Sequence, residues 1–301
     1  MIHKPRYLKP KDKVSIVATA KKVKGPDIEN GAEILEKWGL TINFGKSLFT
    51  KENQFAGNDE KRIKDLQTAI DDPEIKAIFC ARGGYGTTRI IDQINFSALE
   101  QFPKWIIGFS DITALLCHLH GLNIESVHAT MPAIFQMKGA EEAVESLRKI
   151  LFGESIEYQV PHHRLNRSGK AQAQIIGGNL SILTHIIGSS SDIDTANKIL
   201  FIEDIDEDLY RLDRMMVQMK RAGKLNQLAG LLIGHFSDMK DNPDDPFGQN
   251  SFEVIASHVN QFNYPLAFGF PVGHEPQNLA IPVSRITKLN VGQEYTTLAF
   301  A

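Results

Sequence analysis

Three residues of this sequence have the side-chain types of a nucleophile, a base and a carboxylate that orients a base. Ser110 follows an apolar run at residues 105–109, and Glu203 and His274 each follow a further apolar run. Their order along the chain, serine then glutamate then histidine, is one that known hydrolytic triads use. The three types fit acyl transfer through a serine nucleophile, although each residue also has an ordinary structural interpretation.

Ser110 lies where an expected strand meets an expected helix. Residues 105–109 form the strand, and the helix covers residues 111–120 with leucines and isoleucines on one face. The free N–H groups and positive dipole end of a helix at this position suit a reaction with an oxyanion. A serine before a helix is also the usual N-cap. The motif is an incomplete nucleophile elbow, because Ile112 stands where a second glycine is expected.

A glycine-rich loop at residues 82–86 follows another expected strand. Its sequence, Arg82-Gly83-Gly84-Tyr85-Gly86, lets the backbone approach a ligand and direct N–H groups toward it. The loop fits an oxyanion-hole donor near Ser110, a phosphate-binding loop or a tight turn. Its spacing matches neither common nucleotide-binding glycine motif, which weakens the phosphate interpretation.

An acidic cluster surrounds the second candidate. Glu203 ends an expected strand, and Asp204, Asp206, Glu207 and Asp208 follow. Carboxylates suit a divalent cation, but the last three also complement the dipole of the helix expected from residue 210. We favour the dipole interpretation for those three. His274 lies in a loop after the strand at residues 265–270, where a lone histidine is more often a surface or hydrogen-bonded residue.

The elements that must position these residues alternate between strand and helix, which predicts an α/β fold with a parallel sheet. In the first half we expect strands at residues 13–20, 40–44, 75–81, 105–109 and 126–129, and helices at 26–38, 59–70, 88–94, 111–120 and 141–152. In the second half we expect strands at 171–176, 198–203, 228–236 and 265–270, short antiparallel strands at 281–301, and helices after 177–179, at 210–222 and at 252–259. A polar linker at 153–170 divides the domains, which we place at 1–160 and 161–301.

Composition limits the class of protein. The chain has 301 residues, a net charge of −3 and no basic stripe, which argues against nucleic-acid binding. No apolar run approaches the ~20 residues of a membrane span, and the N-terminus lacks a signal-peptide pattern. Cys80 and Cys117, the two cysteines, lie in apolar surroundings typical of reduced thiols. We therefore expect a cytoplasmic two-domain protein with no membrane partner.

Five sequence blocks together resemble the LD-carboxypeptidase family, which includes muramoyl-tetrapeptide carboxypeptidases and microcin C immunity peptidases. The blocks are residues 82–86, 108–115, 177–180, 202–204 with 210–214, and 271–274. They occur in order over nearly the whole chain. The resemblance implies a flavodoxin-like N-terminal domain carrying the nucleophile and a smaller β-rich C-terminal domain carrying the other two triad members.

The resemblance also implies roles. Ser110 corresponds to the nucleophile, His274 to the general base and Glu203 to its orienting carboxylate, with the backbone N–H groups of Gly84 and Asp111 as oxyanion-hole donors. The expected substrate-binding residues are Arg82, Gly83, Tyr85, Gly177, Gly178 and Asn179. The family uses no metal and no organic cofactor, and its members are commonly homodimers. The implied activity is removal of terminal D-alanine from murein tetrapeptides, a small peptide substrate, during peptidoglycan recycling.

Two departures and three alternatives accompany this expectation. Residues 129–131 are Ala-Thr-Met where many relatives have Gly-Pro-Met, and the loop at 238–249 has few aromatic residues near it, which favours a muropeptide substrate. The alternatives are hydrolysis of a peptidyl or aminoacyl nucleotide conjugate, a non-catalytic binding module, and a metal-dependent hydrolase using Glu203, Asp204 and Asp206.

Overall fold

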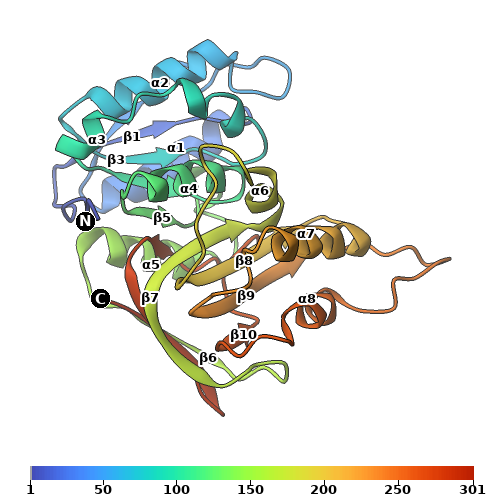
Figure 1. The fold of residues 1–301 in the computed structure, drawn as a ribbon. Helices are drawn as coiled ribbons and strands as arrows, with labels where there is room; N and C mark the ends of the chain where they lie inside the picture. Colours follow the sequence, from blue (N-terminus) through green and yellow to red (C-terminus); the bar gives the residue numbers. More distant parts are fainter. Residues whose placement is uncertain (1) are drawn as a thin grey trace. The chain divides into compact units, whose positions relative to one another are not determined.

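The computed structural model describes residues 2–301, and its contacts divide the chain into two compact units (Figure 1). The first unit runs to Ser155 and also takes in the later segment Pro276–Ser284. The second consists of Ile156–Glu275 and Arg285–Ala301. The change of unit after Ser155 lies near the domain boundary that we expected at 160/161. The return of Pro276–Ser284 to the first unit has no signal in the local sequence.

The first unit is built on a six-stranded sheet with the order β11-β5-β4-β3-β1-β2. Its strands are β1 (Lys13–Val17), β2 (Thr41–Phe44), β3 (Ile75–Cys80), β4 (Trp105–Gly108), β5 (Ser126–His128) and β11 (Ile281–Val283). The first five pair in parallel, and β11 pairs antiparallel with β5. The order 2-1-3-4-5 is that of flavodoxin-like sheets, which confirms the predicted fold of this part.

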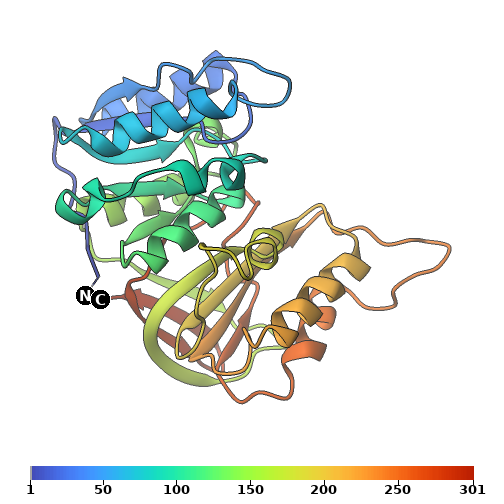
Figure 2. The ribbon, with the colours of Figure 1, turned by 45° about the horizontal axis from the view of Figure 1, so that its top comes forward.

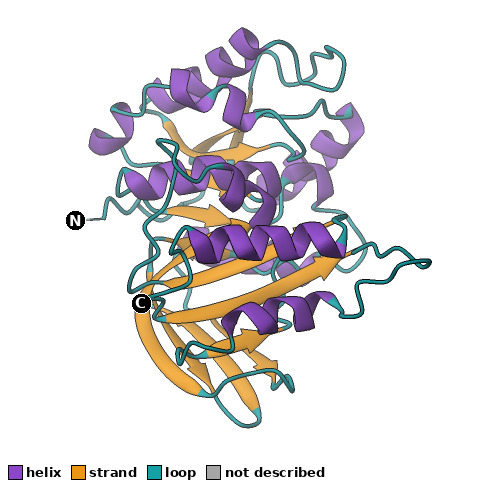
Figure 3. Cartoon of the chain, turned by 45° about the vertical axis from the view of Figure 1, so that its right-hand side comes forward, coloured by secondary structure: helices purple, strands orange, loops and turns teal. Residues whose placement is uncertain are grey.

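Helices lie on both sides of this sheet (Figure 3), so its central strands are buried on both faces. They are α1 (Gly25–Lys37), α2 (Asp59–Asp71), α3 (Ala98–Gln101), α4 (Thr113–Gly121) and α5 (Glu141–Phe152), with the 3₁₀ turns η1 (Thr87–Arg89), η2 (Ile91–Gln93), η3 (Ser110–Ile112) and η4 (Pro132–Ile134). The helix predicted at 88–94 is wrong, because η1 and η2 occupy that segment as two separate turns.

The second unit is built on a seven-stranded sheet with the order β10-β9-β8-β7-β12-β13-β6. Its strands are β6 (Glu157–Pro161), β7 (Gly169–Asn179), β8 (Ile199–Ile205), β9 (Gly230–Ser237), β10 (Leu266–Phe268), β12 (Ile286–Val291) and β13 (Tyr295–Phe300), and its helices are α6 (Leu180–His185), α7 (Leu209–Arg221) and α8 (Ser251–Val259). The parallel half holds β7 to β10, and the antiparallel half holds β7, β12, β13 and β6.

Strand β7 belongs to both halves and is strongly curved (Figure 2). Residues 175–179 pair in parallel with β8, and residues 169–174 pair antiparallel with β12. The observed strand β7 is therefore longer than the strand that we predicted at residues 171–176. It includes Gly177 and Gly178, which we expected to follow the strand and lead into a helix. Strand β6 also lies within the segment that we predicted to be a linker.

Candidate active site

The turn that carries Ser110 has an unusual backbone conformation. Ser110 has φ +63°, in the left-handed region that non-glycine residues seldom adopt. The turn η3 begins at Ser110, and α4 follows only at Thr113, so the predicted helix from residue 111 starts later than expected. A Cβ at Gly108 would lie 2.8 Å from the Ile112 side chain. The glycine therefore makes room for Ile112 beneath a strained serine, and strain of this kind gathers at functional sites.

The glycine-rich loop packs directly against Ser110. A Cβ at Gly83 would lie 2.9 Å from the Ser110 Cβ and 3.1 Å from its Oγ, so only glycine lets the loop approach this closely. Arg82 is exposed, as is Tyr85, whose ring centroid lies 5.9 Å from that of Phe55. The loop backbone is thus a neighbour of the Ser110 side chain, as an oxyanion-hole donor loop must be.

Glu203 and His274 are in direct contact. The His274 Nδ1 lies 2.7 Å from the Glu203 Oε2, and the two side chains are 14% and 0% exposed, respectively. Burial opposes a charge on His274, but the neighbouring Glu203 carboxylate outweighs it and raises the pKa of His274 above its ordinary value. With Glu203 ionised, Nδ1 donates to the carboxylate and Nε2 is the basic nitrogen.

Two glycines leave the space that Glu203 occupies. A Cβ at Gly273 would lie 3.0 Å from both the Cβ and the Oε2 of Glu203, and one at Gly234 would lie 3.1 Å from the Glu203 Cβ. Our sequence interpretation missed Gly234, although an isolated glycine inside an apolar strand is a known signal of close backbone approach. Gly273 therefore limits where the carboxylate can lie, whereas Gly234 makes room mainly for Val272, whose carbonyl oxygen a Cβ there would approach to 2.4 Å.

Asn179 and Asp204 form a second polar group beside Glu203. Asn179 is the strand partner of Glu203, and its Nδ2 donates to the Asp204 Oδ1 at 2.9 Å while its Oδ1 accepts the Ile182 N–H. The Asp204 Oδ2 accepts both the N–H and the hydroxyl of Ser181. Burial, together with the charge of Glu203, raises the pKa of Asp204 to about 6. Asn179 thus caps α6 and holds Asp204, and its role in substrate binding stays a prediction.

Gly177 and Gly178 lie on β7, where they pair with Phe201 and Ile202 of β8. A Cβ at Gly177 would lie 1.9 Å from the Phe201 carbonyl oxygen, so the close strand pairing itself requires glycine there. Substrate contact by these two glycines stays a prediction.

The acidic cluster after Glu203 is divided among separate partners. Asp204 is held by Asn179 and Ser181, and Asp206 forms an ion pair with Lys240 at 2.5 Å. Among residues 2–301, no three or more histidine, cysteine or acidic side chains are arranged to hold a metal ion. In the same range, no helix has both the length and the apolar character that a bilayer span requires.

The candidate residues fall into two groups on different units. The structure brings Glu203 and His274 together in the second unit, and it places Ser110 against Gly83 in the first. Each group is positioned by carboxyl ends of parallel strands, where sites of α/β sheets lie.

Comparison with known proteins identifies relatives that match most of the chain. Sequence profiles of the LD-carboxypeptidase N-terminal and C-terminal domains match residues 14–129 and 172–289. The chain is 33% identical to a protein of Bacillus subtilis named probable murein peptide carboxypeptidase, over 97% of this chain and 93% of that protein. It is 28% identical to the murein tetrapeptide carboxypeptidase of Pseudomonas aeruginosa, over 92% of each.

Solved structures share the fold. The muramoyltetrapeptide carboxypeptidase from Oxalobacter formigenes superposes with a TM-score of 0.87 at 24% identity, covering 96% of this chain and 98% of that one. The microcin C7 self immunity protein in complex with glutamyl sulfamoyl guanosine gives a TM-score of 0.88 at 19% identity, covering 98% of each. At these identities the likeness establishes the fold alone.

Proposed function

Because this chain belongs to the LD-carboxypeptidase family, we propose that it is a serine carboxypeptidase that releases the terminal D-alanine of murein tetrapeptides. The names of its relatives support this substrate class. The observation that carries the proposal is the 2.7 Å contact between His274 and the fully buried Glu203. A buried carboxylate that orients one imidazole nitrogen and leaves the other basic is the arrangement that a serine nucleophile needs.

In the proposed mechanism, the His274 Nε2 takes the hydroxyl proton of Ser110 as the Ser110 Oγ attacks the carbonyl carbon before the terminal D-alanine. The carbonyl oxygen becomes an oxyanion, which the N–H groups of Gly84 and Asp111 stabilise. His274 then returns the proton to the leaving amine, the C–N bond breaks, and D-alanine departs. A water molecule, deprotonated by His274, hydrolyses the acyl-enzyme and restores Ser110. The mechanism requires His274 to reach Ser110 during the reaction.

Hydrolysis of a peptidyl or aminoacyl nucleotide conjugate by the same residues is our second candidate. One observation in the second unit favours it, namely a pocket of about 530 Å³ lined by the aromatic side chains of Tyr210 and Phe247, on which a base can stack. The same pocket is lined by Asp208, Asp241 and Asp245 against the single cation of Lys240. This acidic lining disfavours a phosphate group, so we rank the conjugate second.

The decisive experiment is mass spectrometry of L-Ala-γ-D-Glu-meso-diaminopimelate-D-Ala incubated with wild-type protein and with Ser110→Ala. We expect the wild type to release one D-alanine, and the variant to lose at least about 10³-fold in kcat, because removing a triad member leaves only binding and oxyanion stabilisation. Circular dichroism should show an unchanged fold. Equal release by both proteins would remove Ser110 from the mechanism. A parallel incubation with an aminoacyl nucleotide conjugate tests the alternative, and hydrolysis of that conjugate alone would select the second candidate.

The cytoplasmic location and the homodimer that we expect from the sequence stay predictions. Size-exclusion chromatography with light scattering tests the second, since a homodimer has twice the mass of the 33.6 kDa chain.

A further inference from the structure

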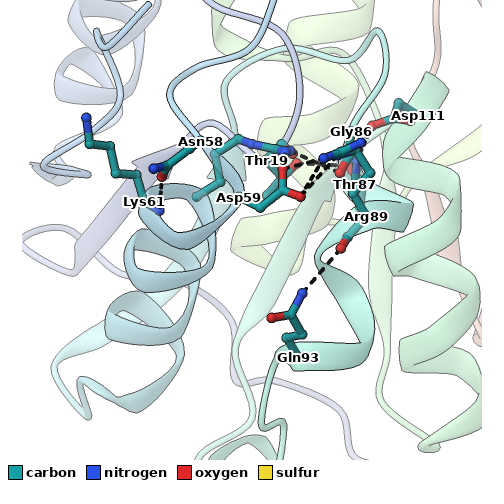
Figure 4. Close-up of polar contacts among 10 residues, drawn as sticks. Thr19, Asn58, Asp59, Lys61, Gly86, Thr87, Arg89, Gln93 and Asp111 are labelled. Atoms are coloured by element: carbon teal, nitrogen blue, oxygen red, sulfur yellow. Dashed lines mark hydrogen bonds and ion pairs between the residues drawn. The ribbon is translucent and has the colours of Figure 1, made fainter. Parts of the chain in front are cut away.

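One peptide group of the glycine-rich loop is held at both ends by buried charged side chains. The carbonyl oxygen of Gly86 accepts a hydrogen bond from the Arg62 Nη1 at 3.0 Å, and the N–H of Thr87 donates to the Asp111 Oδ2 at 2.9 Å. These two atoms belong to the same peptide bond. Arg62 and Asp111 are each only 1% exposed. In Figure 4, Gly86 and Thr87 lie beside the Asp111 side chain.

Arg62 is itself fixed from several directions. Its guanidinium donates to the Thr19 carbonyl oxygen and to the Asp59 carboxylate, and it lies 4.9 Å from the centre of the Phe55 ring. Asp59 also binds the exposed Arg89 at 2.8 Å. Burying an arginine is costly unless its donors are bonded. Among the described residues the Arg62 Nε has no hydrogen-bond partner, so the guanidinium depends on the partners of its two Nη atoms.

Asp111 connects the loop to the nucleophile. Asp111 is the residue after Ser110 in the turn η3, and its carboxylate accepts a hydrogen bond from the Thr87 N–H at the start of η1. A second contact reinforces the connection, since the Thr87 hydroxyl lies 3.0 Å from that of Thr19, whose carbonyl oxygen is held by Arg62. Hydrogen bonds to ionised groups are about twice as strong as neutral ones. Two of them at opposite poles of one peptide group set the rotation of that group.

We propose that the side chains of Arg62 and Asp111 are positioning residues that fix the Gly86–Thr87 peptide group and thereby the oxyanion-donor geometry of the loop. This inference rests on the proposed function, in which the N–H groups of Gly84 and Asp111 are the donors. Asp111 contributes twice, because its backbone supplies one donor and its side chain holds the loop that supplies the other. Arg62 lies outside every sequence block that suggested the site.

Kinetics with the murein tetrapeptide test the proposal. We expect Arg62→Lys and Asp111→Ala each to lower kcat by about 10–100-fold with KM changed less than about threefold, because small misplacements of preorganised donors act on the transition state. Asp111→Asn retains an acceptor oxygen and should recover part of the loss. The matched control is Arg89→Lys, which alters the other arginine side chain on Asp59 and retains the backbone N–H of residue 89 that also donates to the Gly86 carbonyl oxygen at 3.2 Å. A wild-type kcat in folded Arg62→Lys, or an equal loss in the control, would overturn the proposal.

The double variant Arg62→Lys/Asp111→Ala provides an independent check. If both side chains act through one peptide group, the double variant should lose about as much kcat as the worse single variant. If the kcat loss of the double variant equals the product of the two single losses, the side chains act separately, and their shared role in holding one peptide group is overturned. If Arg62→Lys does not fold, Asp59→Asn replaces it as the test variant, because it weakens the contact between the Arg62 guanidinium and the Asp59 carboxylate. An unchanged kcat in Asp59→Asn counts equally against the proposal.

Hydrogen exchange separates this proposal from the proposed function. Exchange mass spectrometry should show faster exchange at residues 82–90 in Arg62→Lys and Asp111→Ala than in wild type, with strands β8 and β9 unchanged. A wild type without hydrolytic activity but with this loop response would contradict only the proposed function. Unchanged hydrogen exchange of residues 82–90 in both variants would overturn the proposed positioning role of Arg62 and Asp111, whatever the activity.

Discussion

The Glu203 contact sets the pH range in which His274 can act as a base. Burial alone would favour the neutral imidazole, but the carboxylate 2.7 Å away raises the pKa of His274 above its ordinary value of 6.5. A base must be neutral to accept the Ser110 proton. Activity is therefore lost as the pH falls through this raised pKa, and the acid limb of kcat/KM should lie above pH 6.5.

Replacing Glu203 by Gln should lower the pKa of His274 relative to wild type. The glutamine retains the shape but removes the charge, so burial remains as the main influence and the pKa of His274 falls below that of wild type. We expect the acid limb of kcat/KM to move to lower pH while the plateau drops by about 10²–10⁴-fold, as the imidazolium loses its partner. A pH–rate profile of both proteins measures this. An unmoved acid limb would mean that His274 is not the titrating base.

Residue types at strand ends were enough to predict Ser110, Glu203 and His274 as candidates. The contact between Glu203 and His274 joins residues 71 positions apart, and nothing in either local sequence indicates it. The supporting glycines were harder to predict because their role is to leave space. Gly234 and Gly273 have no chemistry of their own. Gly273 leaves space for the Glu203 side chain, and Gly234 leaves space for the Val272 carbonyl oxygen and, next to it, for the Glu203 Cβ.

At the scale of elements, the loop at 82–86 and the turn η3 form one packed surface around Ser110. Gly83→Ala should disturb this surface directly, since the new Cβ would lie 2.9 Å from the Ser110 Cβ. We expect kcat/KM to fall by about 10²-fold through displacement of the nucleophile. The control is Gly121→Ala at the end of α4, where an added Cβ meets nothing within 4 Å. Steady-state kinetics that show equal activities for the two variants would contradict the packing explanation.

The loop after β10 supports the base in a similar way. Gly273→Ala combines a positive φ with a Cβ 3.0 Å from Glu203, whereas Gly269→Ala has a positive φ but no neighbour within 4 Å. Both variants should lose stability from backbone strain, of order 1–3 kcal/mol each. Only Gly273→Ala should also shift the acid limb of the pH–rate profile, because it moves the carboxylate that sets the His274 pKa. Identical profiles for the two variants would argue against that coupling.

Two elements were predicted poorly, each for a different physical reason. Residues 88–94 have isoleucines at helical spacing, yet the chain forms two 3₁₀ turns there. The first turn begins at Thr87, whose N–H donates a hydrogen bond to the Asp111 carboxylate. Strand β6 was missed because the surrounding residues are polar, although Tyr158 and Val160 alternate with exposed neighbours as a half-buried strand requires. Long periodic helices such as α1 and α2 were predicted to within a few residues.

At the scale of the whole molecule, two domains were expected from the chain length and the polar segment at 153–170, and no sequence feature indicated the exchange of segments between the two units. Strand β11 pairs with β5 across more than 150 residues of sequence. Local periodicity carries no information on such a pairing, and Pro282 within β11 argues only for an edge position. The family blocks also gave the order of the site residues without showing which residues complete each sheet.

The edge strand β11 offers a test of this exchange. Ile281 is fully buried, and Ile281→Ala should lower the free energy of unfolding by about 2–5 kcal/mol. The loss should weaken hydrogen-exchange protection of β5 in the first unit before that of β9 in the second. The control Ile286→Ala changes a residue that is 42% exposed on β12 and should have a small effect. Equal loss of protection in β5 and β9 would indicate that the two units unfold as one.

The late position of β11 also affects how the protein is made. A ribosome synthesises β5 and then the main part of the second unit before it reaches Ile281. At typical rates of synthesis this interval lasts on the order of 10–30 s. Throughout it, the backbone groups of Ser126–His128 that β11 will bind face outward as an open sheet edge, a template for association with other chains. The first domain to emerge is therefore among the last to be completed, and the nascent chain is most exposed to misassembly while its second unit is being translated.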